Sequence, residues 1–233
     1  MSALDLLSVM RRPGTALLAA SGENSAWEVF SDPVRILRAH CIDEVEPLFY
    51  ELERLTAEGF HAAGFVAYEA APAFDSALTV HEKLSGLPLA EFAVYGHAPL
   101  TVGVPDDLGG HLHAPLEPEL SEKEYGKQIA DVLNHIHAGD IYQANLTFRC
   151  RSVETVYAEE LFLSLAARHP VPYAAFLNFE ECRILSLSPE LFLESDGRRI
   201  FSSPMKGTAK RSPIPADDRA VAEWLAHDEK NMA

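Results

Sequence analysis

The stretch Tyr173–Ser202, YAAFLNFEECRILSLSPELFLESDGRRIFS, decides the fold. Three short apolar runs follow one another, and the Asp196-Gly197 pair separates the last of them from a fourth. Asp-Gly between two β-forming runs is a strong signal for a tight hairpin turn. The stretch therefore predicts an antiparallel meander with strands at Tyr173–Phe179, Arg183–Leu187, Leu191–Glu194 and Arg199–Ser202.

Two helices and a strand are predicted upstream of this meander. Ser121 and Glu124 have the spacing of a capping box, so a helix is expected to begin there and to end at Gly139. Its predicted buried stripe consists of Tyr125, Ile129, Val132, Leu133 and Ile136. A strand over Ile141–Ser152 and a second helix over Glu159–Arg168, stopped by Pro170, complete this region.

The first half of the chain predicts short strands around one long helix. Apolar residues recur with a helical period over Asp43–Glu58, with Asp43 as the expected N-cap and Gly59 as the stop. The run His61–Ala70 is a candidate central strand, and Thr101–Glu119, rich in Pro, Gly and Asp, is a candidate linker. The remaining strands are expected at Ala16–Ala20, Trp27–Phe30, Val34–Ala39 and Leu89–Tyr95. Helices followed by an antiparallel meander define an α+β protein.

Composition and charge exclude several classes of function. The chain has 233 residues and a formal net charge of −16, which argues against a nucleic-acid partner because phosphates require a basic face. The apolar run Ala16–Ala20 is too short for a secretion signal or a membrane span. Cys41, Cys150 and Cys182 are far apart in sequence, which is typical of buried thiols in a reducing compartment. A cytoplasmic protein without a membrane partner is expected.

Histidines in the candidate linker offer little as metal ligands. His111 and His113 have no cysteine or further histidine at metal-binding spacing, so they are interpreted as solvated loop residues.

A lysine and a glutamate are the candidate catalytic residues. Lys206 lies in Pro204-Met205-Lys206-Gly207-Thr208, where the flanking residues restrict the backbone and can aim its amine into a site. Glu190 also lies at the edge of an apolar strand. Such a pair suits a nucleophilic amine and a carboxyl group that transfers protons.

Four segments resemble motifs of the chorismate-utilising enzymes. Three occur in the family's order, at Gly139–Thr147 (GDIYQANLT), Ser186–Leu193 (SLSPELFL) and Pro204–Arg211 (PMKGTAKR). A fourth, Gly64–Ala70 (GFVAYEA), is similar to a motif of the family's N-terminal part. The resemblance implies an anthranilate synthase component I-like fold, with large antiparallel sheets and helices on the outside. It further implies an N-terminal component I-type region at 1–118 and the first half of a chorismate-binding catalytic domain at 119–233.

Two positions point to one branch of that family, aminodeoxychorismate synthase component I. Anthranilate synthases resemble this chain but have a small residue at the place of Lys206, whereas the aminodeoxychorismate synthases use a lysine there as a nucleophile. Isochorismate and salicylate synthases have a water-activating lysine at the place of Gln143, and glutamine fits enzymes that take ammonia. The resemblance thus implies amination of chorismate at C4, a step toward p-aminobenzoate and folate. The alternatives are an anthranilate synthase component I-like enzyme and an inactive, truncated chorismate-binding fragment.

The same resemblance assigns roles and partners. Lys206 would form a covalent adduct with chorismate, Glu190 would move protons, and Gln143, Gly207 and Thr208 would contact the substrate. Burial against Met205 and Phe201 would keep the lysine amine neutral, and partial burial would keep the Glu190 carboxyl group protonated. Lys210 and Arg211 would help to balance the negative charge near the site. Ammonia would come from a glutamine amidotransferase subunit. The full-length enzyme would use Mg²⁺, and its metal ligands are expected beyond Ala233. The 233-residue chain is therefore expected to be truncated, inactive alone and unable to hold Mg²⁺.

Overall fold

The computed structural model describes residues 3–20, 26–81, 86–103, 115–205 and 207–228. Lys206, His111 and His113 lie outside these ranges, so what the sequence predicts of them stays a prediction.

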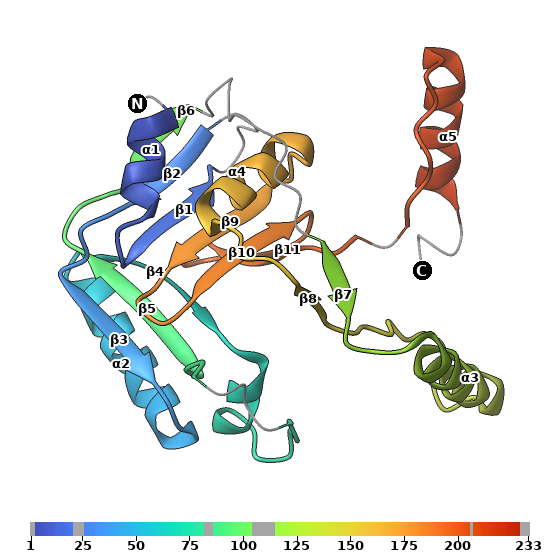
Figure 1. Ribbon diagram of the computed structural model, residues 1–233, viewed down its shortest axis with the longest axis horizontal. Helices are drawn as coiled ribbons and strands as arrows, with labels where there is room; N and C mark the ends of the chain where they lie inside the picture. The colour runs from blue at the N-terminus through green and yellow to red at the C-terminus, as the bar shows by residue number, and fades with distance from the viewer. Residues whose placement is uncertain (1–2, 21–25, 82–85, 104–114, 206, 229–233) are drawn as a thin grey trace.

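A five-stranded antiparallel sheet forms the centre of the molecule (Figure 1). Its order is β10-β9-β1-β2-β6, so two late strands and three early strands lie side by side and meet where β9 pairs with β1. In the register, Leu17 pairs with Val29 on one side and with Phe176 on the other. The sheet crosses the predicted boundary at residue 118, and the regions on either side of it therefore share one core. The strands are β1 (Thr15–Ala19), β2 (Ala26–Phe30), β6 (Leu100–Gly103), β9 (Tyr173–Asn178) and β10 (Arg183–Ser188).

A second, three-stranded antiparallel sheet has the order β3-β5-β4. It consists of β3 (Arg35–Ala39), β4 (His61–Val66) and β5 (Ala90–Tyr95). The prediction of a central strand over His61–Ala70 is wrong, because β4 is an edge strand. It ends at Val66, and the chain then enters the 3₁₀ helix η1 (Tyr68–Ala73), which contains Pro72. Proline has no N–H to give to a sheet, which limits the strand there.

The long predicted helix is confirmed as α2 (Ile42–Ala57), although its cap differs. The N-cap residue is Cys41 and not Asp43, because the Glu44 carboxylate accepts hydrogen bonds from the backbone N–H groups of His40 and Cys41. This contact fixes the helix start two residues earlier than the sequence predicts. Gly59 follows the helix with φ of 93°, as expected for a stop residue.

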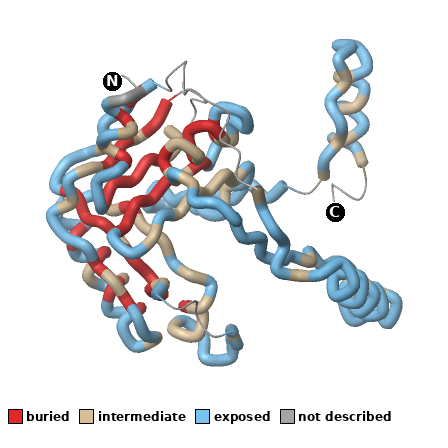
Figure 2. The backbone as a smooth tube through the Cα atoms, in the orientation of Figure 1, coloured by how far each residue is buried: buried red, intermediate tan, exposed pale blue. Residues whose placement is uncertain are grey.

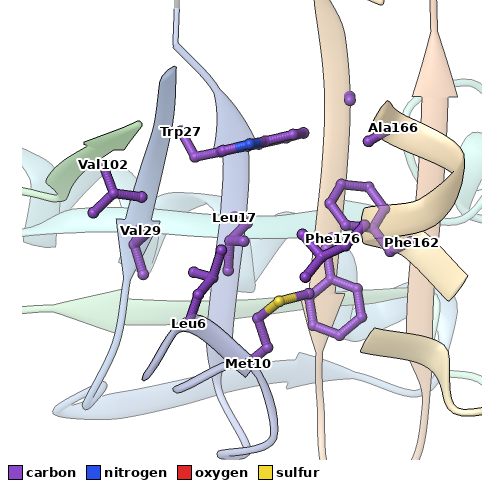
Figure 3. Packing of buried hydrophobic residues seen from close by; sticks show 11 residues of the cluster. Leu6, Met10, Leu17, Trp27, Val29, Val102, Phe162, Ala166 and Phe176 are labelled. Carbon is purple, nitrogen blue, oxygen red and sulfur yellow. The ribbon is translucent and has the colours of Figure 1, made fainter. Parts of the chain in front are cut away.

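Helices cover the outer faces of the two sheets, and three apolar clusters hold the layers together. The first cluster lies between the five-stranded sheet and the helices α1 (Ala3–Met10) and α4 (Ala158–Arg168), as Figure 3 shows. The second joins α2 to the three-stranded sheet. The third lies between the two sheets and is called the inter-sheet core below. Its buried members are Ala16, Phe30, Ala63, Ala93, Tyr95, Leu177 and Phe179. The predicted α+β class with antiparallel sheets and outer helices is confirmed.

Three further parts lie outside these two sheets, and Figures 1 and 2 show that α3 with its neighbouring strands and α5 extend away from the layered body. The first is the pair of short strands β7 (Leu116–Pro118) and β8 (Cys150–Ser152) with helix α3 (Glu122–Ala138). The second is the hairpin of β11 (Leu191–Ser195) and β12 (Ile200–Ser203), and the third is helix α5 (Pro215–His227). Most of their residues are exposed.

The start of α3 is confirmed, but its predicted burial is wrong. Ser121 and Glu124 form the capping box, and Gly139 ends the helix with φ of 81°. However, no α3 residue is buried, because no described element covers its apolar stripe. The Tyr125 ring contacts only the neighbouring Phe148 ring, at 5.6 Å between centroids. The strand expected over Ile141–Ser152 is reduced to β8.

Cysteine burial also departs from the sequence prediction. Cys41 and Cys150 are exposed and only Cys182 is partly buried, because the first two lie at a helix start and on a projecting strand. Within the described ranges, no helix combines the length and apolar character needed to cross a membrane.

Candidate active site

The β11–β12 hairpin brings the two candidate catalytic segments to the same end of the molecule. Leu191 pairs with Ser203, so Glu190 directly precedes this pair and Pro204 directly follows it. The turn at the other end is fixed by the Asp196 carboxylate, which accepts hydrogen bonds from the N–H groups of Arg198 and Arg199. Lys206 comes two residues after Pro204 in the sequence. The hairpin thus brings together in space two segments that are far apart in sequence, the one that carries Glu190 and the one that leads to Lys206.

Glu190 lies in the bend between β10 and β11, where the Ser188 hydroxyl group hydrogen-bonds to its backbone. Ser188 Oγ lies 3.2 Å from the Glu190 nitrogen and 3.0 Å from the Glu190 carbonyl oxygen, so it can accept from the first or donate to the second. The sequence signal for this anchor is the serine in Ser188-Pro189-Glu190. Glu190 itself is exposed. The partial burial expected to keep its carboxyl group protonated is therefore not supplied by the described residues.

The glycine-threonine pair after Lys206 belongs to an irregular segment between β12 and α5. Gly207 is half-buried and Thr208 is exposed. Met205 and Phe201, which were expected to bury the lysine amine, keep 51% and 45% of their surface exposed. These two side chains are thus not themselves packed into an apolar environment in the described structure.

A carboxylate on α5 holds the far end of this segment. Asp218 accepts hydrogen bonds from Arg211, at 2.8 Å from Nε and 2.6 Å from Nη2, and from the Ser212 N–H at 3.0 Å. The Arg211 bond is the main reason that the pKa of Asp218 lies below its usual value. The sequence alone did not indicate this pair. It occupies Arg211, which was a candidate for balancing the negative charge around a substrate.

Gln143 lies on a different segment from the other candidates. It is exposed, in the irregular stretch that leads from α3 to β8. The start of this stretch is held by His135, whose Nδ1 lies 2.8 Å from Asp140 Oδ2. Among the described residues, no hydrogen bond joins Gln143 to Glu190, Gly207 or Thr208. The hairpin thus brings Glu190 close to the start of the Lys206 segment, whereas no described hydrogen bond links Gln143 to either of them.

The described residues do not form a metal site. Within them, no group of three or more His, Cys, Asp or Glu side chains is placed to hold a metal ion. Mg²⁺ requires near-octahedral oxygen coordination, which the described residues do not supply.

Comparison with known proteins gives the family. The model of the chorismate binding enzyme family matches residues 105–233, which is more than half of the chain. Anthranilate synthase component 1 of Thermus thermophilus is 37% identical over 131 residues, which are 56% of this chain and 28% of that protein. Aminodeoxychorismate synthase component 1 of Escherichia coli is 36% identical over 117 residues, which are 50% of this chain and 26% of that protein.

Solved structures share the fold. The anthranilate synthase component I of Streptococcus pneumoniae has a TM-score of 0.59 at 16% identity, covering 95% of this chain and 56% of its own. The isochorismate synthase-type protein DhbC of Bacillus anthracis has a TM-score of 0.63 at 17% identity, covering 98% of this chain and 59% of its own. The sheets and helices of this chain therefore adopt the fold of these two proteins.

The chain belongs to the chorismate binding enzyme family. It spans little more than half the length of the solved relatives, and the matched segment spans about a quarter of the curated ones.

Proposed function

We propose that this chain contributes to an aminodeoxychorismate synthase component I-type enzyme, which aminates chorismate at C4 to give 4-amino-4-deoxychorismate. The observation that carries the proposal is the β11–β12 hairpin, whose register brings Glu190 to the segment that contains Lys206. Relatives of two kinds match the chain at similar identity, so the choice of branch rests on Lys206.

The proposed chemistry uses the lysine as a nucleophile and the glutamate as an acid. The neutral Lys206 amine forms a bond from Nζ to C2 of the ring, both ring double bonds shift toward C4, and the 4-hydroxyl group leaves as water while the new ammonium gives up a proton to solvent. Glu190 donates the proton that this leaving group requires. Ammonia then adds at C4 and the lysine leaves from C2, so that two easier steps replace one difficult displacement.

Substrate binding and the supply of ammonia involve further residues and a partner subunit. Gln143, Gly207 and Thr208 contact the substrate, and a glutamine amidotransferase subunit supplies ammonia in a cytoplasmic setting. Because Glu190 and Met205 are exposed in the described structure, the burial that the chemistry requires must come from parts of the active enzyme outside the described residues. The described chain alone is thus expected to be inactive, and Mg²⁺ would be held elsewhere in the enzyme.

The second candidate is an anthranilate synthase component I-like activity, which the 37% identical relative from Thermus thermophilus favours. The two reactions differ in the carbon that receives nitrogen, C4 or C2, and the products are separable by chromatography and NMR.

The test assays the complete protein that carries this chain, with chorismate, Mg²⁺ and ammonia. We expect the 4-amino product from wild type, loss of at least about a hundredfold in rate in Lys206→Ala, and little change in the matched control Lys210→Ala. A 2-amino product, or full activity in Lys206→Ala, would show that the proposed branch is wrong.

A further inference from the structure

A fully buried carboxylate lies at one end of the inter-sheet core. Glu91 is on β5, where it shares a strand face with Ala93 and Tyr95, two members of that core. The register places Arg38 of β3 beside Glu91 on one side and Phe65 of β4 on the other. A buried charge of this kind requires partners for both of its oxygen atoms.

Among the described residues, only one oxygen of Glu91 has a hydrogen-bond partner. Arg38 donates from Nε at 2.9 Å and from Nη2 at 2.5 Å, and both bonds go to Oε1. Oε2 is buried and accepts no hydrogen bond in the structure. An Arg–carboxylate pair normally uses both oxygens, and a buried acceptor without a donor destabilises a fold. Glu91 Oε2 can therefore still accept a hydrogen bond from a second donor.

The turn between β9 and β10 brings a candidate donor to this place. The Phe179 N–H donates to the Cys182 carbonyl at 2.9 Å, which closes the turn, and the Phe179 ring contacts the Phe65 ring at 5.7 Å between centroids. Cys182 is partly buried and packs against the inter-sheet core. Cys182 thus lies beside the inter-sheet core, to which the face of β5 that carries Glu91 also contributes Ala93 and Tyr95.

Electrostatics agree with this placement. Burial raises the pKa of the Cys182 thiol, and the charges of Glu91 and Glu181 raise it further, while Arg38 lowers it. The thiol is therefore kept in its S–H form, which can donate a hydrogen bond.

We propose that the Cys182 thiol turns toward Glu91 Oε2 and donates a hydrogen bond to it, making Cys182 a protected modification site at the sheet junction. The contact supplies the donor that Oε2 lacks and ties the β9–β10 turn to β5. Alkylation or oxidation of Cys182 would remove the S–H donor and place a larger group between the sheets. Modification then requires local opening of the junction and weakens it afterwards.

The consequence for reactivity is specific to one of the three cysteines. With iodoacetamide, a thiolate forms a C–S bond and displaces iodide, while the thiol proton goes to solvent. Cys41 and Cys150 are exposed, so both should react as ordinary thiols. Cys182 should react at least about tenfold more slowly, because the reaction requires both local opening and loss of a proton.

The decisive experiment observes the S–H group directly. In a Cys41→Ser, Cys150→Ser background, Cys182 is the only thiol, and its S–H stretching band is recorded by infrared spectroscopy in the folded protein and in urea. We expect a lower wavenumber in the folded state than in the unfolded one. Glu91→Gln should shift the band toward the unfolded value, because an amide oxygen accepts more weakly than a carboxylate. The matched control, Glu180→Gln, alters an exposed neighbour and should leave the band in place.

Two results would overturn the proposal. One is an S–H band that coincides in the folded and unfolded protein, and the other is alkylation of Cys182 as fast as that of Cys41. Both are read without altering Glu91, so they hold even if Glu91→Gln does not fold. Cys182→Ser keeps a donor and should stay closer to wild type in urea stability than Cys182→Ala.

Discussion

Replacing Asn178 with alanine should destabilise the protein, because its side chain joins the end of α1 to the central sheet. Asn178 Nδ2 donates to the Met10 carbonyl at 2.6 Å and to the Arg12 carbonyl at 3.2 Å, and the residue is only 1% exposed. The Met10 carbonyl is one of the groups that a helix end leaves without an internal partner. The Arg12 carbonyl keeps a second bond from the Thr15 N–H at 3.2 Å.

The size of the loss follows from these contacts. Leaving the buried Met10 carbonyl unsatisfied costs about 1–3 kcal/mol, and the second bond contributes about 1 kcal/mol. We therefore expect Asn178→Ala to lower the free energy of unfolding by about 2–4 kcal/mol, measured by urea denaturation. Asn178→Asp should lose more, because a carboxylate cannot donate and would face two carbonyl oxygens.

Asn134, exposed on α3, provides the matched control. Asn134→Ala removes an amide of the same type but no described hydrogen bond, so its effect should stay within about 0.5 kcal/mol. If Asn178→Ala behaves like Asn134→Ala, the amide does not hold α1 on the sheet.

Three further outcomes are expected. Gly64→Ala should lower the free energy of unfolding by about 3 kcal/mol or more, because the new Cβ would lie 2.1 Å from a β5 carbonyl oxygen. Gly126→Ala, in open space on α3, should raise it by about 0.5–1 kcal/mol. Equal effects of the two substitutions in urea denaturation would contradict this. Hydrogen bonds from Arg54 and Arg35 lower the pKa of Glu51 from 4.5 to about 2. The stability that this carboxylate contributes is present above pH 4.5 and lost as the pH falls toward 2, so Glu51→Gln should flatten thermal stability in that window. Unchanged pH dependence would exclude the effect. Phe192 is 82% exposed on β11, and an exposed aromatic ring on a strand favours association between copies. We therefore expect Phe192→Ser to scatter less light than wild type at equal concentration, and equal scattering would contradict this.

Local signals predicted the elements of this fold well. The Asp196-Gly197 turn, the Ser121 capping box and the stop at Gly139 are all confirmed, because each depends on residues close in sequence. Sheet order was beyond such signals. No local pattern shows that β9 pairs with β1, more than 150 residues away, or that a strand as apolar as β4 lies at a sheet edge.

The candidate site was predictable in part for the same reason. The sequence singles out Glu190 and Lys206 by their motifs, and the hairpin register brings Glu190 next to the start of the Lys206 segment, while their catalytic roles stay a prediction. The burial expected around Glu190 and along α3 failed, because an amphipathic pattern shows which face a helix can bury but not what covers it. The Arg211–Asp218 pair escaped prediction because two opposite charges seven residues apart are common in any sequence.

The most direct test of the central claim looks for the covalent adduct itself. The complete protein is mixed with chorismate, quenched in acid within the first turnover and digested, and the peptide containing Lys206 is analysed by mass spectrometry. We expect Lys206 to carry an added mass equal to that of chorismate minus water. This added mass should be absent once ammonia has consumed the adduct, and absent from Lys210 throughout. Formation of the 4-amino product with no adduct on Lys206 at any time during turnover would contradict it.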